Sequence, residues 1–189
     1  MEQNRLISAL ADSPIIAAVK DAEGLEKCLA SECRVVFILF GDVVGICGLV
    51  DRVKSSGKIA MVHVDLIDGL SPKEVAIDFI AKKTNADGII TTKANLTRRA
   101  KKHGLYTVQR FFVLDSISLS NVEKQLPLEN ADLIEILPGV MPKIIRQLAE
   151  TTGKPIIAGG LIRDKEDIIN ALEAGAVAIS STNRGSWAL

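Results

Sequence analysis

The sequence has few of the residues that build disulfide frameworks, zinc sites or base-stacking surfaces. Its three cysteines, Cys28, Cys33 and Cys47, form no C-x-x-C pair and have no cluster of histidines beside them. A scattered, odd-numbered set is typical of reduced, buried thiols and argues against a disulfide framework or a zinc site. With one Trp, one Tyr and five Phe in 189 residues, aromatic side chains for stacking nucleic-acid bases are also scarce.

The chain also lacks an excess of charge, a signal peptide and long hydrophobic runs. Lys plus Arg and Asp plus Glu both total 23, so no global positive field attracts nucleic acid or anionic lipid, and any nucleic-acid site must be local. The start, MEQNRLISALADSP, contains acids and has no basic segment before an unbroken apolar core, so we expect a cytoplasmic protein. Apolar runs such as 35–40 are far shorter than the roughly 20 residues of a membrane span, so we expect a soluble protein without a membrane partner.

What is present is a regular alternation of short apolar runs and longer amphipathic stretches. The composition, 48% hydrophobic and 24% charged, is typical of one globular domain, which we expect to span residues 1–189. The alternation predicts βα units and a parallel sheet whose strands are covered on both faces. The eight expected strands are Ile15–Val19, Val35–Phe40, Met61–Leu66, Gly88–Thr92, Tyr106–Val113, Leu133–Ile136, Ile156–Ala158 and Ala176–Ser180.

Capping signals indicate where the intervening helices begin and end. Ser71, followed by Pro72 and Glu74, predicts one helix start, and Asp164, followed by further acids, predicts another. Four glycines predict helix ends, at Gly57, Gly104, Gly153 and Gly175.

Eight parallel strands that are each followed by a helix close most naturally into a (β/α)8, TIM-barrel-like fold. The chain is shorter than the usual length of about 250 residues, and roughly two dozen residues for each unit leave no room for a lid or an inserted domain. An open doubly wound sheet is the alternative, but it usually has fewer strands, and no G-x-G-x-x-G motif follows the first strand. We therefore expect a compact barrel in a single α/β domain.

In such a barrel the carboxyl ends of the strands surround the functional mouth. The residues expected there are Lys20, Gly41, Asp42, Asp65, Asp68, Thr91–Lys93, Asp115, Ser116, Glu135, Leu137–Gly139, Gly159, Gly160 and Ser180–Thr182. The mouth is thus polar and carries both signs of charge.

The most specific feature of this mouth is a predicted phosphate site. Gly159 and Gly160 follow the seventh strand, and Ser180, Ser181 and Thr182 end the eighth. Barrel phosphate sites are built after these two strands, where glycines let N–H groups approach an anion and hydroxyls add donors. The alternative is that the glycines only form a tight turn and the hydroxyl residues only cap a final short helix.

Other mouth residues allow more than one chemistry. We expect Lys20, Asp65 and Glu135 to bind the rest of a phosphorylated ligand, but two carboxylates near a lysine also fit acid–base or Schiff-base catalysis. His63 lies two residues before Asp65, so the two would face the same way on a strand, and both a structural and a functional role remain open for it. Arg110 is unusual in a core strand and requires a partner such as Glu135 or Asp65.

One local cluster of cations qualifies for contact with nucleic acid. Arg98, Arg99, Lys101 and Lys102 lie on the helix expected after the fourth strand, and three of them share roughly one side of it. In a neutral chain they are the best candidates for contact with RNA phosphates. A run of charges also suits an ordinary solvated helix face, and no RNP motif, KH loop or zinc finger accompanies this one.

Six segments together resemble the family of glycerol uptake operon antiterminator regulatory proteins, which respond to glycerol 3-phosphate. The similarity runs over nearly the whole chain. The segments are Pro14–Lys20, His63–Ser71, Asp87–Lys93, Gln109–Ser116, Ile134–Gly139 and Pro155–Ile162.

This resemblance implies a (β/α)8-like barrel that is not an enzyme and uses no cofactor. Glycerol 3-phosphate would be its effector, and the loaded protein would bind leader messenger RNA of glycerol catabolic genes, so that a terminator hairpin does not stop transcription. By position, Gly159, Gly160, Ser180 and Ser181 would hold the phosphate, and Lys20, Asp65 and Glu135 would lie near the glycerol hydroxyls. The resemblance assigns no RNA-contacting residues, and a monomer and a homo-oligomer both remain open.

The alternative to a regulator is a phosphosugar isomerase or aldolase-type barrel enzyme. It would use Lys20 or Lys93 together with Asp65 or Glu135. Barrels host many unrelated functions, so the fold alone does not decide. The enzyme must turn over a substrate or form an imine, whereas the regulator must bind RNA with a salt-dependent affinity. The family segments favour the regulator.

Overall fold

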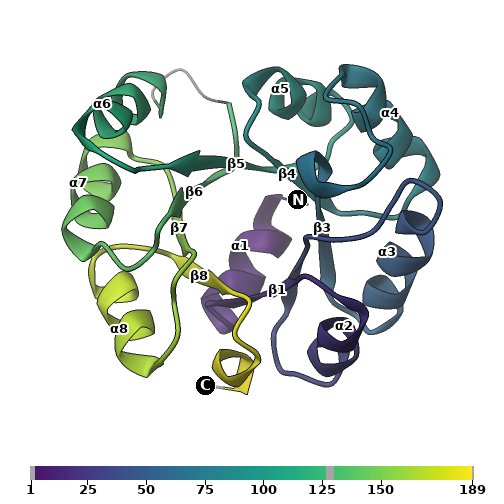
Figure 1. Ribbon diagram of the computed structural model, residues 1–189, viewed down its shortest axis with the longest axis horizontal. Helices are drawn as coiled ribbons and strands as arrows, with labels where there is room; N and C mark the ends of the chain where they lie inside the picture. Colours follow the sequence, from purple (N-terminus) through teal and green to yellow (C-terminus); the bar gives the residue numbers. More distant parts are fainter. Residues whose placement is uncertain (1–2, 127–129, 189) are drawn as a thin grey trace.

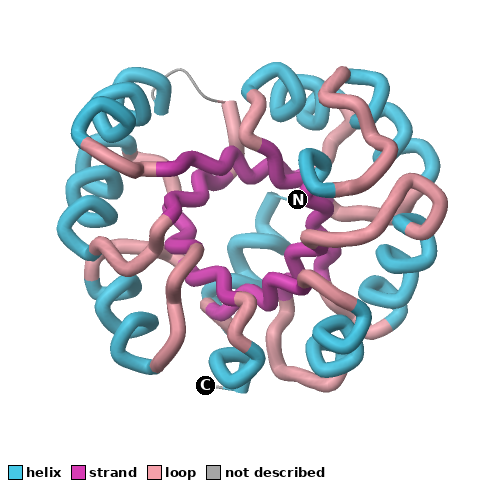
Figure 2. The backbone as a smooth tube through the Cα atoms, viewed as in Figure 1, coloured by secondary structure: helices cyan, strands magenta, loops and turns pink. Residues whose placement is uncertain are grey.

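The computed structural model describes residues 3–126 and 130–188. Its eight parallel strands pair in chain order, and the eighth pairs with the first, so the sheet closes into a barrel (Figure 2). The strands are β1 (Ile15–Val19), β2 (Val35–Ile38), β3 (Ile59–His63), β4 (Gly88–Thr91), β5 (Tyr106–Phe112), β6 (Leu133–Leu137), β7 (Ile156–Gly159) and β8 (Ala178–Ser181). The closed barrel confirms the predicted TIM-barrel-like fold and excludes the open doubly wound sheet.

The helices that follow the strands form a ring around the barrel, and one further helix precedes the first strand (Figure 1). They are α1 (Gln3–Asp12), α2 (Ala22–Leu29), α3 (Ile46–Ser55), α4 (Glu74–Lys83), α5 (Ala94–Lys102), α6 (Ser116–Gln125), α7 (Pro142–Thr152) and α8 (Lys165–Glu173), with the 3-10 helices η1 (Val64–Leu66) and η3 (Arg184–Ala188). One α-helix follows each of the first seven strands, and η3 follows the eighth. No described helix is long and apolar enough to cross a membrane.

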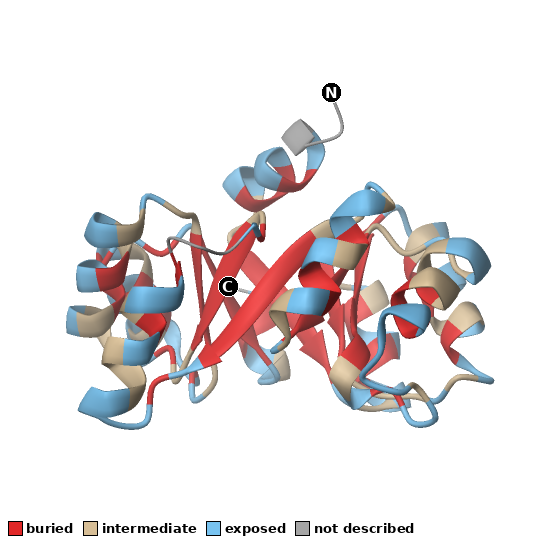
Figure 3. Ribbon diagram, turned by 90° about the horizontal axis from the view of Figure 1, so that it is seen from above, coloured by how far each residue is buried: buried red, intermediate tan, exposed pale blue. Residues whose placement is uncertain are grey.

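The inside of the barrel is filled by every second side chain of the strands. Phe37, Met61 and Ile90 belong to this inner cluster, which is separate from the larger core between the strands and the outer helices. Leu6 and Leu10 of α1 pack onto the inner cluster, and α1 lies across the end of the barrel at which the strands begin (Figures 1 and 3). Each such buried leucine stabilises the fold by about 1.5–3 kcal/mol. This end of the barrel is therefore closed.

Toward the opposite end the inner side chains become polar. His63, Arg110, Glu135 and Ser180 stand two residues after apolar members of the inner cluster, so the alternation of each strand points them into the barrel as well. All four are buried. A buried polar layer of this kind is costly unless it is internally paired, and it places chemistry directly below the mouth.

The third strand differs from its predicted extent of Met61–Leu66. It runs from Ile59 to His63, and the chain then turns into η1. Asp65 therefore lies on a 3-10 turn, and the expectation that it shares a strand face with His63 is wrong. The turn is stabilised by hydrogen bonds from the end of β4 to the carboxylate of Asp65, a contact between distant parts of the sequence.

The other boundaries follow the predictions more closely. The remaining strand ends lie within two residues of those expected. Asp164 caps α8 as predicted, with its carboxylate accepting from the Asp167 N–H at 3.0 Å. The predicted cap at Ser71 is wrong, because α4 begins at Glu74 after Lys73 and has no side-chain cap. The four predicted terminal glycines all have positive φ values.

Candidate functional site

The carboxyl ends of the strands surround a cavity of about 570 Å3, within the usual size range of about 300–1,000 Å3 for small-molecule sites. Residues of β1, β5, β6 and β8, with residues that follow β1, β2, β7 and β8, form its walls. They are Ala18, Lys20, Leu39, Arg110, Glu135, Leu137, Gly160, Leu161, Ile162, Arg163, Ser180, Ser181, Thr182 and Asn183. The cavity thus brings together Lys20, Glu135, Gly160, Ser180 and Ser181 of the predicted site residues. Asp65 and Gly159 are not among its lining residues.

Positive charge dominates this cavity. Lys20, Arg110 and Arg163 line it, and Glu135 is the one carboxylate among the lining residues. Lys20 and Arg163 are exposed and form no ion pair with any described residue. Arg110 and Arg163 were not among the predicted ligand-binding residues. An arginine inside a buried strand was the signal for the first, whereas the exposed Arg163 has no distinctive sequence pattern.

Arg110 and Glu135 form a buried ion pair in the cavity wall. They stand side by side in the β5–β6 register, and Arg110 Nε donates to Glu135 Oε2 at 2.6 Å. This confirms the predicted need for a carboxylate partner and identifies it as Glu135. Arg110 keeps about 10% of its side chain exposed, whereas Glu135 is fully buried. The terminal nitrogens of Arg110 form no hydrogen bond to another described residue, so they remain available to a ligand.

Glu135 itself has no oxygen to spare. Its second oxygen, Oε1, accepts from the Ser180 hydroxyl at 2.5 Å. A Cβ atom on Gly159 would lie 2.5 Å from the same oxygen and 2.7 Å from Ser180 Oγ. Gly159 is therefore required by close packing behind the wall. Both Glu135 oxygens and the Ser180 hydroxyl proton are thus engaged in holding Arg110 in place.

The loop after β7 has an unusual backbone. Gly160 has φ 75° and Leu161, although not a glycine, has φ 63°. Such a conformation costs an ordinary residue about 1–2 kcal/mol, and this kind of strain concentrates at functional sites. The Leu161 side chain is exposed at the cavity rim, so burial of the side chain does not compensate for the strain.

Hydrogen bonds join this loop to the end of β8. The Ser181 hydroxyl donates to the Ile162 carbonyl at 3.0 Å and accepts from the Asn183 N–H at 3.0 Å. Asn183 Nδ2 donates to the Arg163 carbonyl at 2.5 Å. The Ser181 hydroxyl is thus already engaged within the protein, and its contribution is to fix the position of the loop that carries Gly160 and Arg163.

Asp65 belongs to a second polar cluster, at the ends of β3 and β4. Its carboxylate accepts from the Thr92 N–H at 2.7 Å, from the Thr91 hydroxyl at 3.0 Å and from Lys93 Nζ at 3.1 Å. Burial raises the pKa of Asp65, but the hydrogen bonds, that from Thr92 N–H first, outweigh it and keep the pKa below its ordinary value. Asp65 is thus ionised and holds Lys93 at the mouth.

Within the buried polar layer, His63 is the one residue with a fully buried nitrogen that lacks a described partner. It is 2% exposed, and its Nδ1 has no hydrogen-bond partner among the described residues. Burial, reinforced by the positive charge of Arg110, lowers the pKa of His63 to about 4. The imidazole is therefore neutral at physiological pH and lies beside the guanidinium without competing for Glu135.

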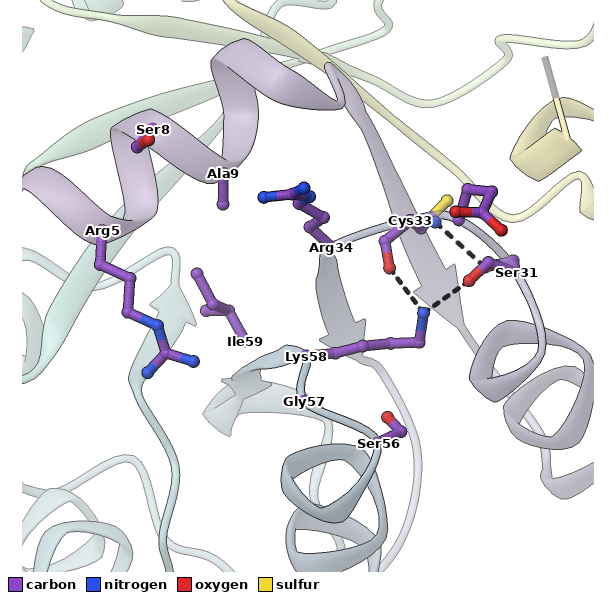
Figure 4. Close-up of a pocket in the computed structure, with 11 residues that line it drawn as sticks. Arg5, Ser8, Ala9, Ser31, Cys33, Arg34, Ser56, Gly57, Lys58 and Ile59 are labelled. Atoms are coloured by element: carbon purple, nitrogen blue, oxygen red, sulfur yellow. Dashed lines mark hydrogen bonds between the residues drawn. The ribbon is translucent and has the colours of Figure 1, made fainter.

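A second cavity, of about 340 Å3, lies at the other end of the barrel beside α1 (Figure 4). Arg5, Arg34 and Lys58 line it. Lys58 is buried, and its Nζ donates to the carbonyls of Ser31 at 2.6 Å and Cys33 at 2.8 Å (Figure 4). Arg5 and Arg34 each pair with a neighbouring aspartate. These cations serve the structure, so the mouth is the better candidate for an anion.

The predicted RNA-contacting cations on α5 have different surroundings. Arg99 forms two hydrogen bonds with Asp78, at 2.7 and 2.9 Å, and Lys101 pairs with Asp132 at 2.6 Å. Hydrogen bonds from Arg99 and then His103 keep the pKa of Asp78 well below its ordinary range. Arg98 and Lys102 form no ion pair with a described residue.

Residues 15–187 match the family model of the glycerol-3-phosphate responsive antiterminator. The chain belongs to this family. It is 46% identical over 184 residues to the uncharacterized protein YgcP of Escherichia coli strain K12, covering 97% of this chain and 96% of that protein. The antiterminator family therefore accounts for nearly the whole length of the chain.

Solved structures of antiterminator proteins share the barrel. A glycerol uptake operon antiterminator regulatory protein from Listeria monocytogenes is 31% identical with a TM-score of 0.89, covering 93% of this chain and 95% of that one. An antiterminator-related protein from Thermotoga maritima is 36% identical with a TM-score of 0.79, covering 92% and 96%. A deoxyribose phosphate aldolase from Aeropyrum pernix, at 16% identity and a TM-score of 0.70, shares the fold alone.

Proposed function

We propose that this antiterminator family member binds glycerol 3-phosphate in the mouth cavity and, when loaded, binds leader messenger RNA of glycerol catabolic genes. RNA binding would prevent a terminator hairpin from stopping transcription. The proposed function needs no cofactor, because the ligand acts as an effector. The family supports the response to glycerol 3-phosphate, and the cavity supplies a site with the right charge and size.

The observation that carries the ligand proposal is the orientation of Arg110. Glu135 fixes its Nε, Arg110 lines the cavity, and its terminal nitrogens have no hydrogen-bond partner among the described residues. A guanidinium held in this way binds a phosphate through short, charge-assisted hydrogen bonds. Lys20 and Arg163 add positive charge, and the glycine at 160 lets the backbone approach the anion.

Of the other residues predicted to bind the ligand, most have a supporting role in the proposed site. Ser180 and Ser181 support the phosphate site by holding Glu135 and the Gly160 loop. Glu135 contributes through Arg110, and Asp65 contributes through Lys93. Lys20 remains the proposed direct contact to the glycerol part of the ligand, because its exposed side chain lines the cavity.

The same contacts favour binding over catalysis. The two carboxylates proposed for the site are both engaged, Glu135 with Arg110 and Ser180, and Asp65 with Lys93 and the end of β4. A general base needs an oxygen within reach of the substrate proton. An imine-forming lysine needs a desolvated, uncharged amine, but Lys20 is exposed and Lys93 is paired with Asp65.

Thermal unfolding tests the ligand site. At 100 times its dissociation constant, glycerol 3-phosphate should add about 2.7 kcal/mol of apparent stability, or roughly 5–11 °C in Tm for a chain of this size, and glycerol alone should add much less. Gly160→Glu should abolish the shift, because it places a carboxylate where the phosphate binds. Gly48→Glu is the matched control, since Gly48 is exposed on α3 with open space around it. Equal shifts from glycerol and glycerol 3-phosphate would reject the phosphate site.

Two further measurements separate regulator from enzyme. A labelled leader transcript should bind more tightly in the presence of glycerol 3-phosphate, and a ligand-dependent footprint should appear on it. Borohydride treatment with dihydroxyacetone phosphate should leave the masses of peptides containing Lys20 and Lys93 unchanged. A reduced adduct on either lysine would overturn the regulator in favour of an aldolase-type enzyme.

A further inference from the structure

The barrel end opposite the ligand cavity carries an open groove of about 670 Å3. It lies between the end of α5 and the segments that lead into β6 and β7. Its lining residues are Arg98, Lys101, Lys102, Asn130, Ala131, Asp132, Thr152, Gly153, Lys154 and Pro155. Four of these ten residues are cationic and Asp132 is the one acid among them, although the chain as a whole has no net charge.

Three of the four cations are not neutralised. Lys101 pairs with Asp132 at 2.6 Å. Within the part of the chain that the structure describes, Arg98, Lys102 and Lys154 have no carboxylate partner, and the Lys154 ammonium contacts only the Ala131 carbonyl, at 3.3 Å. Positive charges without partners thus converge on one groove from α5 and from the loop before β7.

The form of the groove selects a chain of phosphates over a small anion. Arg98 and Lys102 are exposed and lie one helical turn apart, about 6 Å along α5, so they can meet successive charges on an extended ligand. A single small anion would need enclosed, convergent donors like those of the mouth cavity. The described lining contains no aromatic residue, so the contact is to the backbone and not to stacked bases.

The groove and the ligand cavity lie at the two ends of the same strands. β6 begins directly after Asp132 in the groove and carries Glu135 in the cavity wall. β7 begins directly after Pro155 and leads to Gly160. Two strands of five and four residues therefore connect the sites, and no shared residue forces ligand and RNA to compete.

We propose that this groove binds the sugar–phosphate backbone of RNA, so that ligand and RNA occupy opposite ends of β6 and β7 at the same time. The inference rests on the proposed RNA-binding function and assigns its surface. It replaces the α5 cluster predicted from the sequence with a different set, in which Lys154 joins Arg98 and Lys102, whereas Arg99 and Lys101 are internally paired.

A pair of triple variants tests the groove. The first replaces Arg98, Lys102 and Lys154 with Ala. The matched control replaces Lys143, Arg146 and Lys165 with Ala, which removes the same charge from exposed positions on α7 and α8 that have no ion pair with a described residue. The probe is a labelled leader transcript of glycerol catabolic genes with saturating glycerol 3-phosphate, titrated between 50 and 200 mM salt.

The groove variant should bind more weakly, and its slope of log affinity against log salt should be less steep by about two units, at roughly 0.7 for each lost single-strand contact. Across this fourfold range of salt, the factor by which affinity falls should therefore be about 16 times smaller for the groove variant than for the wild type. The control variant should keep the wild-type slope. Both variants should keep the full thermal shift with glycerol 3-phosphate, because the cavity is unchanged.

Four results would overturn the assignment. An unchanged slope in the folded groove variant, or an equal loss in the control, would place the RNA elsewhere while leaving the proposed function intact. Loss of the ligand-induced thermal shift in the groove variant would show that the two sites are not at separate ends. Absence of RNA binding by the wild-type protein would instead reject the proposed function, and the groove with it.

Discussion

Exchange of Glu135 for Gln tests whether the negative charge of Glu135 competes with a bound phosphate for Arg110. In the wild-type protein, Arg110 Nε donates to Glu135 Oε2 at 2.6 Å. The amide of Gln has nearly the same shape as the carboxylate and keeps one oxygen that can accept this hydrogen bond. The negative charge is lost, and the second oxygen becomes an amide nitrogen that can only donate to Ser180 Oγ instead of accepting from it. In the wild type this charge neutralises Arg110, so the variant leaves a buried guanidinium in the cavity wall without a paired carboxylate.

The cost to the unliganded protein follows from the two hydrogen bonds of the carboxylate. A bond to a charged partner contributes about 1.5–3 kcal/mol and a neutral one about 0.5–1.5 kcal/mol, so we expect Glu135→Gln to destabilise the fold by about 1–3 kcal/mol. A bound phosphate should compensate the unpaired charge of Arg110, so the variant should bind the ligand more tightly than the wild type does. One unit charge at roughly 6 Å in an effective dielectric of about 20 is worth about 3 kcal/mol, and if half of this survives screening, glycerol 3-phosphate should bind about tenfold more tightly.

Calorimetric titration and thermal unfolding measure both effects. The control is Asp78→Asn, which removes a carboxylate paired with Arg99 outside the cavity. It should also destabilise the protein but leave the affinity for glycerol 3-phosphate within about twofold of the wild type. If folded Glu135→Gln bound the ligand no more tightly than the wild type, the phosphate would not be sharing Arg110 with Glu135, and the reasoning would fail.

Three other exchanges test the layers around the site. Because the pKa of buried His63 is lowered to about 4 from 6.5, the unfolded chain takes up its proton first, so the free energy of unfolding should fall as pH drops below about 6.5 until about pH 4. Between pH 7 and pH 5 this residue should account for about 2 kcal/mol. Urea unfolding at both pH values should show a smaller difference for His63→Gln, and an equal difference would mean that His63 is not held neutral. Gly159→Ala forces a Cβ against Glu135 Oε1, so it should lower the free energy of unfolding by at least about 1–3 kcal/mol. An unchanged free energy of unfolding in the same assay would show that the Glu135 side chain can move aside. Leu10→Ala should cost about 2–5 kcal/mol if α1 closes the barrel as an integral element, whereas a change below about 0.5 kcal/mol would show that it does not.

Local patterns were sufficient to predict the barrel. Continuous apolar runs at regular spacing identified all eight strands, and their number favoured closure. The third strand was misplaced because its end depends on a contact between distant segments, the hydrogen bonds from β4 to Asp65. The role of α1 was also not predicted, because an amphipathic start shows a buried face without showing that this face covers the inside of a barrel.

The candidate site was predicted in part, for a related reason. Position at strand ends found Lys20 and Gly160, and the cost of a buried guanidinium predicted that Arg110 has an acidic partner. Residue type alone does not show whether a polar group is already engaged. Ser180 was predicted as a phosphate contact, yet its hydroxyl donates to Glu135. Arg99 was predicted as an RNA contact, yet it pairs with Asp78, 21 residues earlier.

The arrangement of the mouth explains how a fold shared with aldolases can serve as a sensor. In an enzyme the acids and amines of the mouth must be free to move protons or form bonds, whereas here Glu135 and Asp65 are bound to Arg110 and Lys93. In the proposed site an incoming phosphate would have one consequence, which is to share Arg110 with Glu135. Because these two residues pair directly across β5 and β6, the ligand would act on the contact between the two strands. Linkage then requires that any gain in RNA affinity caused by the ligand is matched by an equal gain in ligand affinity caused by RNA. The strand that connects the two sites is β6, which carries Glu135, the partner of Arg110, and begins directly after Asp132 in the groove.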